Sequence, residues 1–244
     1  MNKKYLGLMA TAVLETTSFT ANAVNFEVYG RANVSMDMVD NDDATVGNES
    51  DTTSFTSTAS RIGFKGDEDL GDGLSAIWKF ENVVNLDDGT NGWGSGRDSY
   101  VGLKGGFGQV VIGRKSTPHK NSTGKLDLSV DTLADYNAVV GTSMNGTNFD
   151  ERYPNSLNYE TNNINGFKFA IAYIAADVQG EDDLPMTTTE SKRSGTSISV
   201  TYEDGPLYLA IANEAMDDNG GAGVDADATK LGGRWDLVKV PRLG

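Results

Sequence analysis

Residues 26–38 alternate between apolar and polar side chains over thirteen positions, and this run constrains the fold most. Phe26, Val28, Val34 and Met36 are among the apolar or small residues at the even positions, while polar and charged residues take the odd ones. Period two is the repeat of a β-strand with one apolar face. Thirteen residues exceed the ~5–6 of an ordinary soluble strand and suffice for a tilted strand of ~9–11 residues across a membrane.

The same alternation returns along the chain and predicts ten strands in all. The other nine runs are residues 61–65, 74–81, 99–104, 109–113, 153–160, 167–173, 197–203, 207–211 and 230–237. Short connections rich in Gly, Asn or Asp alternate with long ones, the longest of which is 115–151. Short turns on one side and long loops on the other are typical of outer-membrane barrels. We therefore predict an all-β fold, an antiparallel transmembrane β-barrel.

Aromatic residues near several strand ends fit this prediction. They are Trp78, Tyr153, Tyr173, Tyr202 and Trp235. On the apolar side of a barrel they would form an interfacial girdle. The alternative is that they are ordinary core aromatics.

The N-terminus predicts export. Lys3 and Lys4 precede an apolar stretch at 5–14, and Ala21-Asn22-Ala23 has the small-x-small pattern of a signal peptidase site. We predict a signal peptide at 1–23 and a barrel domain at 24–244, although Glu15 interrupts the apolar region. The alternative for 1–23 is a short buried helix. No later segment has the ~20 apolar residues of a membrane helix.

Charge and composition narrow the function classes. The formal net charge is −15 and no basic stripe is present, which argues against a nucleic-acid partner. The chain has no cysteine and one histidine, His119, so a two-histidine metal site is excluded and a Ser-His triad has little support. We expect His119 to be an ordinary loop side chain and predict no catalytic residue, cofactor or metal.

A glycine-rich hairpin is the most specific local motif. Residues 97–118 read RDSYVGLKGGFGQVVIGRKSTP, with strand-like runs on both sides of a turn at 105–108. This hairpin resembles the one that leads into the constriction loop of Gram-negative general diffusion porins, where VGLKG, a turn through FG, GR and TP recur in that order. The resemblance extends over most of the chain through VYGRANV at 28–34, SRIGFKG at 60–66 and RYPNSLNYET at 152–161.

The resemblance implies a basic cluster on the barrel wall. The matching residues are Arg31, Arg61, Arg97 and Arg152. Strict alternation gives Arg97 the opposite parity to Lys104, so we expect a β-bulge or a register shift between them.

The resemblance also implies that the segment at about 115–151 folds into the barrel as a constriction loop with acidic side chains. Here it offers Asp127, Asp131 and Asp135. Leu128 and Leu133 are available to pack against the wall. Carboxylates facing arginines across a narrow lumen would set up a transverse field. The alternative is a solvated acidic loop outside the barrel.

The end of the chain departs from the family. Porins of this kind have sixteen strands and finish on an aromatic residue, whereas this sequence ends at Gly244. About ten of the sixteen strands are readable. We therefore expect an incomplete barrel and a 244-residue form that neither makes stable trimers nor conducts as a complete porin does.

The function expected from the resemblance is passive diffusion of small hydrophilic solutes and ions across the outer membrane of a Gram-negative cell. The resemblance implies a homotrimer that contacts outer-membrane lipid and lipopolysaccharide and is inserted by the barrel assembly machinery. Two alternatives remain open. One is a secreted or surface-exposed all-β binding protein without channel activity, which would lack an outward apolar band, and the other is an outer-membrane barrel enzyme.

Overall fold

The computed structural model describes residues 5–21, 24–39, 52–87, 96–132, 149–175, 194–218 and 223–236. Within these ranges twelve strands form one antiparallel sheet. The strands are β1 (Tyr5–Ala21), β2 (Val24–Val39), β3 (Thr52–Ser57), β4 (Arg61–Gly71), β5 (Leu74–Val83), β6 (Gly96–Gly105), β7 (Gly108–Ser116), β8 (Arg152–Glu160), β9 (Phe167–Ile174), β10 (Ser194–Asp204), β11 (Leu207–Asp217) and β12 (Ala226–Trp235). The helices are α1 (Pro118–Thr123) and the 3-10 helix η1 (Gly124–Leu126). Neither of these described helices is long and apolar enough to cross a membrane.

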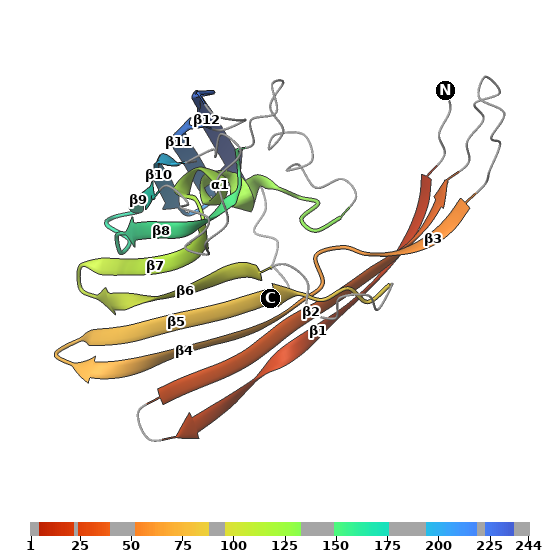
Figure 1. Ribbon diagram of the computed structural model, residues 1–244, viewed down its shortest axis with the longest axis horizontal. Coiled ribbons are helices and arrows are strands. Elements are labelled where there is room, and N and C mark those ends of the chain that lie inside the picture. The colour runs from red at the N-terminus through yellow and green to blue at the C-terminus, as the bar shows by residue number, and fades with distance from the viewer. Residues whose placement is uncertain are drawn as a thin grey trace, which may run out of the picture.

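Strands that follow one another in the chain lie side by side in the sheet. The order is β1-β2-β4-β5-β6-β7-β8-β9-β10-β11-β12, and β3 pairs with the second half of β2. The sheet curves, and α1 lies inside the curve against β9 to β12 (Figure 1). Across the described residues the sheet ends at β1 and β12, which do not pair with each other. The fold is an open antiparallel wall with a concave and a convex face.

The ten predicted strands are confirmed as β2 and β4 to β12, and the all-β antiparallel class is confirmed with them. β3 was not predicted, because its Thr- and Ser-rich sequence has no apolar alternation. β1 was not predicted either, since it lies in the segment assigned to the signal peptide. It pairs with β2 from Tyr5↔Val39 to Ala21↔Val24. The signal peptide at 1–23 stays a prediction, and residues 1–4 and 22–23 lie outside the described part.

The two faces of the sheet differ as the alternation predicts. On β11, Tyr208 and Ala212 are buried on the concave face, whereas Leu209 and Ile211 are about half exposed on the convex face. Convex side chains of other strands are also exposed: Val101, Ile112, Leu157, Ile171, Ile198 and Leu231. An apolar band of this extent is unfavourable in water and favourable against lipid. This band is the feature that a soluble all-β binding protein would lack.

The turns between paired strands are short where the sequence predicted short turns. Between β4 and β5, Asp72 and Gly73 have φ values of 52° and 74°. Two successive positive φ values match the type I′ hairpin turn, which glycine and aspartate tolerate best. The long predicted segment after β7 begins with α1 and η1, and Thr117 caps α1 by accepting a hydrogen bond from the Lys120 backbone amide at 3.2 Å.

A register shift between β5 and β6 re-aims side chains on the concave face. Phe80 pairs with Ser99, but Asn82 pairs with Gly96, so β6 has one extra residue at this point. This β-bulge is the break in parity that was expected between Arg97 and Lys104. It brings two consecutive side chains of β6, Arg97 and Asp98, into contact with residues of the concave face.

A second shift separates β7 and β8. Gly113 pairs with Ser156 but Lys115 pairs with Tyr153, and Asn155 between them has a φ of 49°. The extra residue on β8 turns Tyr153 to the opposite face from the one that its parity predicts. The predicted girdle position of Tyr153 is therefore wrong, because the residue is only 4% exposed. It belongs to a buried cluster with Phe149, Ala172, Ile174 and Met216.

Candidate functional site

Asp131 lies between two of the predicted wall arginines. Its Oδ2 accepts hydrogen bonds from Nη1 of Arg31 and Nη1 of Arg61, each at 2.8 Å. The side chain of Asn33 also donates to the Asp131 backbone carbonyl at 2.7 Å. Arg31 and Arg61 stand on the neighbouring strands β2 and β4 and are register partners. The arginine side chains stay 26% and 21% exposed, so they remain in reach of water.

The other two predicted arginines share a chain of charges on the same wall. Nε of Arg97 donates to Glu81, and Nε of Arg152 donates to Asp98 at 3.0 Å. Lys79 joins these carboxylates, at 3.4 Å from Glu81 and 3.7 Å from Asp98.

Tyr29 completes this group from β2. Its hydroxyl donates to Glu81 at 2.7 Å, and its ring fills the space beside Gly63, where a Cβ would lie 2.2 Å from the ring. Sequence reasoning missed both acidic members of the group. The signal for both was present, since Glu81 has the polar parity of its strand and Asp98 has the same parity as Tyr100 and Lys104.

The predicted acidic residues of the loop have different positions. Asp131 contacts the far wall, as described. Asp127 accepts a hydrogen bond from the backbone amide of Ser129 at 2.8 Å. Asp135 lies outside the described residues, as does Leu133. The expectation that Leu128 packs against the wall is wrong, since it is 94% exposed. Leu126 takes that role, in contact with the Gly232 position of β12.

A buried polar cluster holds α1 to the opposite part of the wall. Nδ1 of His119 donates to Asp150 at 2.9 Å, and Lys230 of β12 binds the same carboxylate oxygen. The backbone amide of His119 donates to Oγ of Ser197 at 3.0 Å, and the Tyr208 hydroxyl donates to the Ser122 carbonyl at 2.6 Å. His119 is therefore not an ordinary loop side chain: it is 3% exposed at the contact between the helix and β10.

The Asp150 carboxyl is shifted by this cluster. Burial alone would raise its pKa, but hydrogen bonds and charge interactions with His119 and Lys230 outweigh burial and lower the pKa below its ordinary value. Asp150 is thus an anion where α1 meets the wall, and its charge is compensated from the helix and from β12. Its carboxylate helps to hold the segment that follows β7 against the wall.

These contacts show the path of the segment that follows β7. α1 packs on β9 to β12, while Asp131, eight residues after the end of α1, binds β2 and β4. The segment therefore crosses the concave face from one part of the wall to the other. A crossing of this kind narrows the space that the curved sheet partly encloses, and it sets one carboxylate against two guanidinium groups there.

Comparison with known proteins agrees with the fold. The family model described as "Gram-negative porin" matches residues 10–241. The chain belongs to the Gram-negative porin family. Membership groups it with proteins of the Gram-negative outer membrane.

Curated relatives are outer-membrane proteins that the chain matches over part of their length. It is 34% identical over 157 residues to the major outer membrane protein P.IB of Neisseria meningitidis serogroup B, over 64% of this chain and 42% of the relative. It is 29% identical over 194 residues to an outer membrane porin of Bordetella pertussis, over 74% of this chain and 49% of the relative. The porin chain described here thus spans less than half the length of these relatives.

Solved porin structures have the same fold. An anion-selective porin from Comamonas acidovorans aligns with a TM-score of 0.70 and 24% identity, over 88% of this chain and 64% of that one. OmpF of Salmonella typhi in complex with daunomycin aligns with a TM-score of 0.63 and 18% identity, over 91% of this chain and 65% of that one. The likeness concerns the fold of the wall.

Proposed function

We propose that this porin is the wall of a passive diffusion channel for small hydrophilic solutes and ions, and not an enzyme. One observation carries the proposal. Asp131 of the segment after β7 binds Arg31 and Arg61 across the concave face, 100 and 70 residues away in sequence. A loop that crosses a curved transmembrane wall on its inside limits the size of the solutes that pass.

The proposed constriction has a basic and an acidic side. Arg31, Arg61, Arg97 and Arg152 are the basic wall, and Asp127, Asp131 and Asp135 belong to the acidic loop. Opposed charges in a narrow lumen orient dipolar solutes and tune the preference for cations or anions. Glu81 and Asp98 on the wall compensate the positive charges of Arg97 and Arg152. Arg31 and Arg61 therefore depend more on the loop carboxylate of Asp131 for charge compensation.

The assembly is proposed from the family. We infer a homotrimer in the outer membrane, in contact with lipid and lipopolysaccharide, exported by the signal peptide at 1–23 and inserted by the barrel assembly machinery. The convex apolar band supports the lipid contact. No cofactor, metal or nucleic acid is part of the proposal.

Two measurements test the function, on the protein expressed with any coding sequence that follows codon 244. In the first, lipid vesicles that contain the purified protein should swell when a small sugar enters them, and size-dependent swelling supports a diffusion channel. Vesicles that do not swell, with protein that migrates as folded on a gel, would exclude the channel.

The second measurement is the reversal potential in a planar bilayer under a salt gradient. Asp131→Asn should shift it toward anions, because two guanidinium groups lose their common counter-charge. Asp127→Asn is the matched control with a smaller expected shift, since the described contact of Asp127 is with a nearby backbone amide. Equal reversal potentials for wild type and Asp131→Asn would place Asp131 outside the conducting path.

A further inference from the structure

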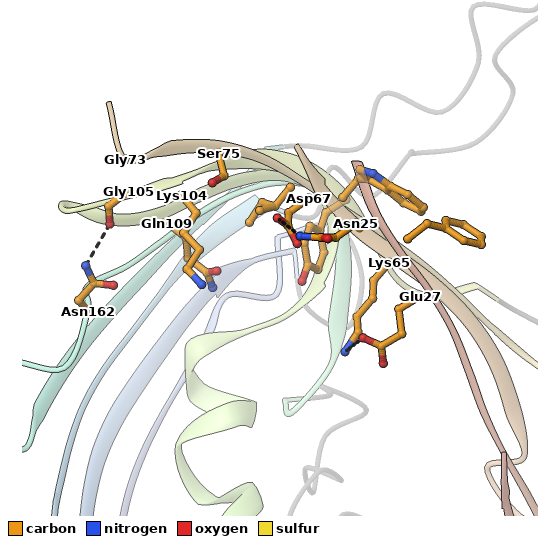
Figure 2. A pocket seen from close by; sticks show the side chains of 15 residues that line it. Asn25, Glu27, Lys65, Asp67, Gly73, Ser75, Lys104, Gly105, Gln109 and Asn162 are labelled. Carbon is orange, nitrogen blue, oxygen red and sulfur yellow. Dashed lines mark hydrogen bonds and ion pairs between the residues drawn. The ribbon is translucent and has the colours of Figure 1, made fainter. Parts of the chain in front are cut away.

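The turn side of the concave face has a cavity that is separate from the arginine groups. It has a volume of about 740 Å³ and lies between the ends of β2, β4, β5, β6 and β7 (Figure 2). Lys104 and Gln109 extend into it side by side, and Lys65 and Glu27 line its other part. Nothing in the proposed constriction uses these side chains.

Most polar groups around this cavity already have partners. Lys65 forms an ion pair with Glu27 at 3.0 Å, and Asp67 accepts a hydrogen bond from Asn25 at 3.0 Å. The amide of Asn162 donates to the backbone carbonyl of Gly105, also at 3.0 Å. These interactions fix the rim of the cavity and leave its centre to other residues.

The centre is a row of three side chains on three neighbouring strands. Lys104 of β6 is the register partner of Ser75 on β5 and of Gln109 on β7. Both neighbours are neutral hydrogen-bonding groups, so no carboxylate lies directly across from the ammonium group. Tyr100, on the same strand and of the same parity, also lines the cavity.

A comparison of the lysines gives a second, independent indication. Five of those in the described ranges form ion pairs with carboxylates: Lys65, Lys79, Lys125, Lys168 and Lys230. Lys120 donates to a backbone carbonyl. Across the same ranges, the two without an ion pair or hydrogen bond are Lys104 and Lys115, and both stand on the β6–β7 hairpin.

Lys115 connects the cavity to the arginine side. Its ammonium group lies 5.7 Å from the centre of the Tyr100 ring, and Tyr100 itself lines the cavity. Lys115 has favourable charge interactions with Glu160 and Asp98, whereas Lys104 stands at the cavity between two neutral register partners. A positive charge without a facing carboxylate raises the local concentration of anions.

We propose that the row Ser75, Lys104 and Gln109 is a binding site for small hydroxylated carboxylates that leave the constriction. The ammonium group of Lys104 would bind the carboxylate, and Ser75, Gln109 and Tyr100 would bind hydroxyl groups. A charge-assisted hydrogen bond is the strong component, and the neutral groups select solutes that carry hydroxyls. The inference rests on the proposed diffusion channel, which brings solutes to the site.

The test is binding of gluconate to the detergent-solubilised protein, measured by saturation-transfer NMR, with glucose as the uncharged comparison. Lys104→Gln should weaken gluconate binding about tenfold, as expected for the loss of one charge-assisted contact. Lys104→Arg should retain binding because the charge remains. Lys65→Gln is the matched control, in which an ion-paired lysine of the same cavity is changed and gluconate affinity is preserved. Glucose binding should be the same in all four proteins.

Unchanged gluconate affinity in Lys104→Gln would overturn the site, and so would equal binding of gluconate and glucose by the wild type. Loss of gluconate binding in Lys104→Arg as well, with folded migration on a gel, would show that charge is not what the site recognises. The binding measurement does not depend on conduction. If vesicles swell normally but affinity does not depend on Lys104, the site fails and the channel stands; if gluconate binds through Lys104 but vesicles do not swell, the channel fails.

Discussion

The two parts of the concave wall use inward-facing charges in different ways. On the open part, from β2 to β6, Arg31 and Arg61 stay 26% and 21% exposed beside Asp131. On the covered part, from β9 to β12, α1 closes over the wall and leaves Lys230 and Asp150 only 11% and 1% exposed. Strand alternation decides which side chains face inward in both parts. The crossing segment decides which of them are hydrated.

The largest expected difference is in the free energy of unfolding when one lysine is removed from each part. Lys230→Met leaves the buried Asp150 carboxylate without one of its partners and should cost about 3–5 kcal/mol. Lys65→Met breaks the more exposed pair with Glu27 and should cost about 0–1 kcal/mol. Urea unfolding from lipid vesicles, followed by tryptophan fluorescence, measures both. Equal losses of unfolding free energy in the two variants would show that the Lys230–Asp150 pair is as hydrated as the Lys65–Glu27 pair.

An arginine introduced on the convex face should destabilise the membrane-inserted protein equally in the open part (β2 to β6) and in the covered part (β9 to β12). Val101→Arg on β6 and Ile198→Arg on β10 place a charge where the apolar band is exposed, at a cost of about 2–4 kcal/mol near the bilayer midplane. Lys104→Arg, inward on β6, should be neutral. Heat-resistant migration after refolding reports the outcome. Tolerance of Val101→Arg would mean that this face does not meet lipid.

Two neighbouring glycines of β12 lie on opposite faces of the sheet, one on the covered concave face and one on the convex face. A Cβ at Gly232 would lie 2.4 Å from Leu126 of η1, whereas a Cβ at Gly233 would lie 3.1 Å from Leu209 on the other side. Gly232→Val should therefore displace η1 and cost about 1–3 kcal/mol through overpacking. Gly233→Val, the control, should have the smaller effect. The same urea titration ranks the two variants, and a larger loss at Gly233 would argue that η1 does not pack on β12.

Acidification should weaken the packing of α1 on β9 to β12, and we expect this effect to be smaller than those of the substitutions above. The pKa of Asp150 is lower in the folded protein, so its contribution to stability is present above the ordinary value of 3.8 and is lost as the pH falls through the folded-state pKa. Hydrogen exchange of the α1 amides should accelerate at about pH 3 relative to about pH 5, beyond the change of intrinsic rate. Asp150→Asn should abolish this extra acceleration. An identical pH response in that variant would assign the effect to other groups.

Much of the wall could be predicted from the sequence because each strand encodes its own two faces. The ten runs with period two correspond to β2 and β4 to β12, and the inward parity of Arg31 and Arg61 followed directly. The parity of Tyr153 failed because a bulge depends on the pairing with β7 and not on local alternation. Arg97 likewise faces inward only through the bulge on β6.

The contacts of the long segment could not be predicted in detail. Three aspartates were candidates for the acidic side, and the sequence alone had no means to rank Asp131 above Asp127, since its partners lie on strands 70 and 100 residues away. His119 had no visible pattern around it. Its role depends on Asp150 and on Lys230, which reaches the same carboxylate from β12.

The most direct test of the central claim, that the segment after β7 crosses the inside of the wall, is a cross-link between the segment and β4. The chain has no native cysteine, so a protein with both Arg61→Cys and Asp131→Cys can be bridged in outer membranes by a short bifunctional thiosulfonate. Arg114→Cys with Asp131→Cys is the control, because Arg114 has the convex parity of β7. A crossing segment predicts an internally bridged product, seen as a shifted band that reductant reverses, for the first pair alone. No bridge in the first double variant, with protein that is folded and whose two thiols each react with a monofunctional reagent, would contradict it.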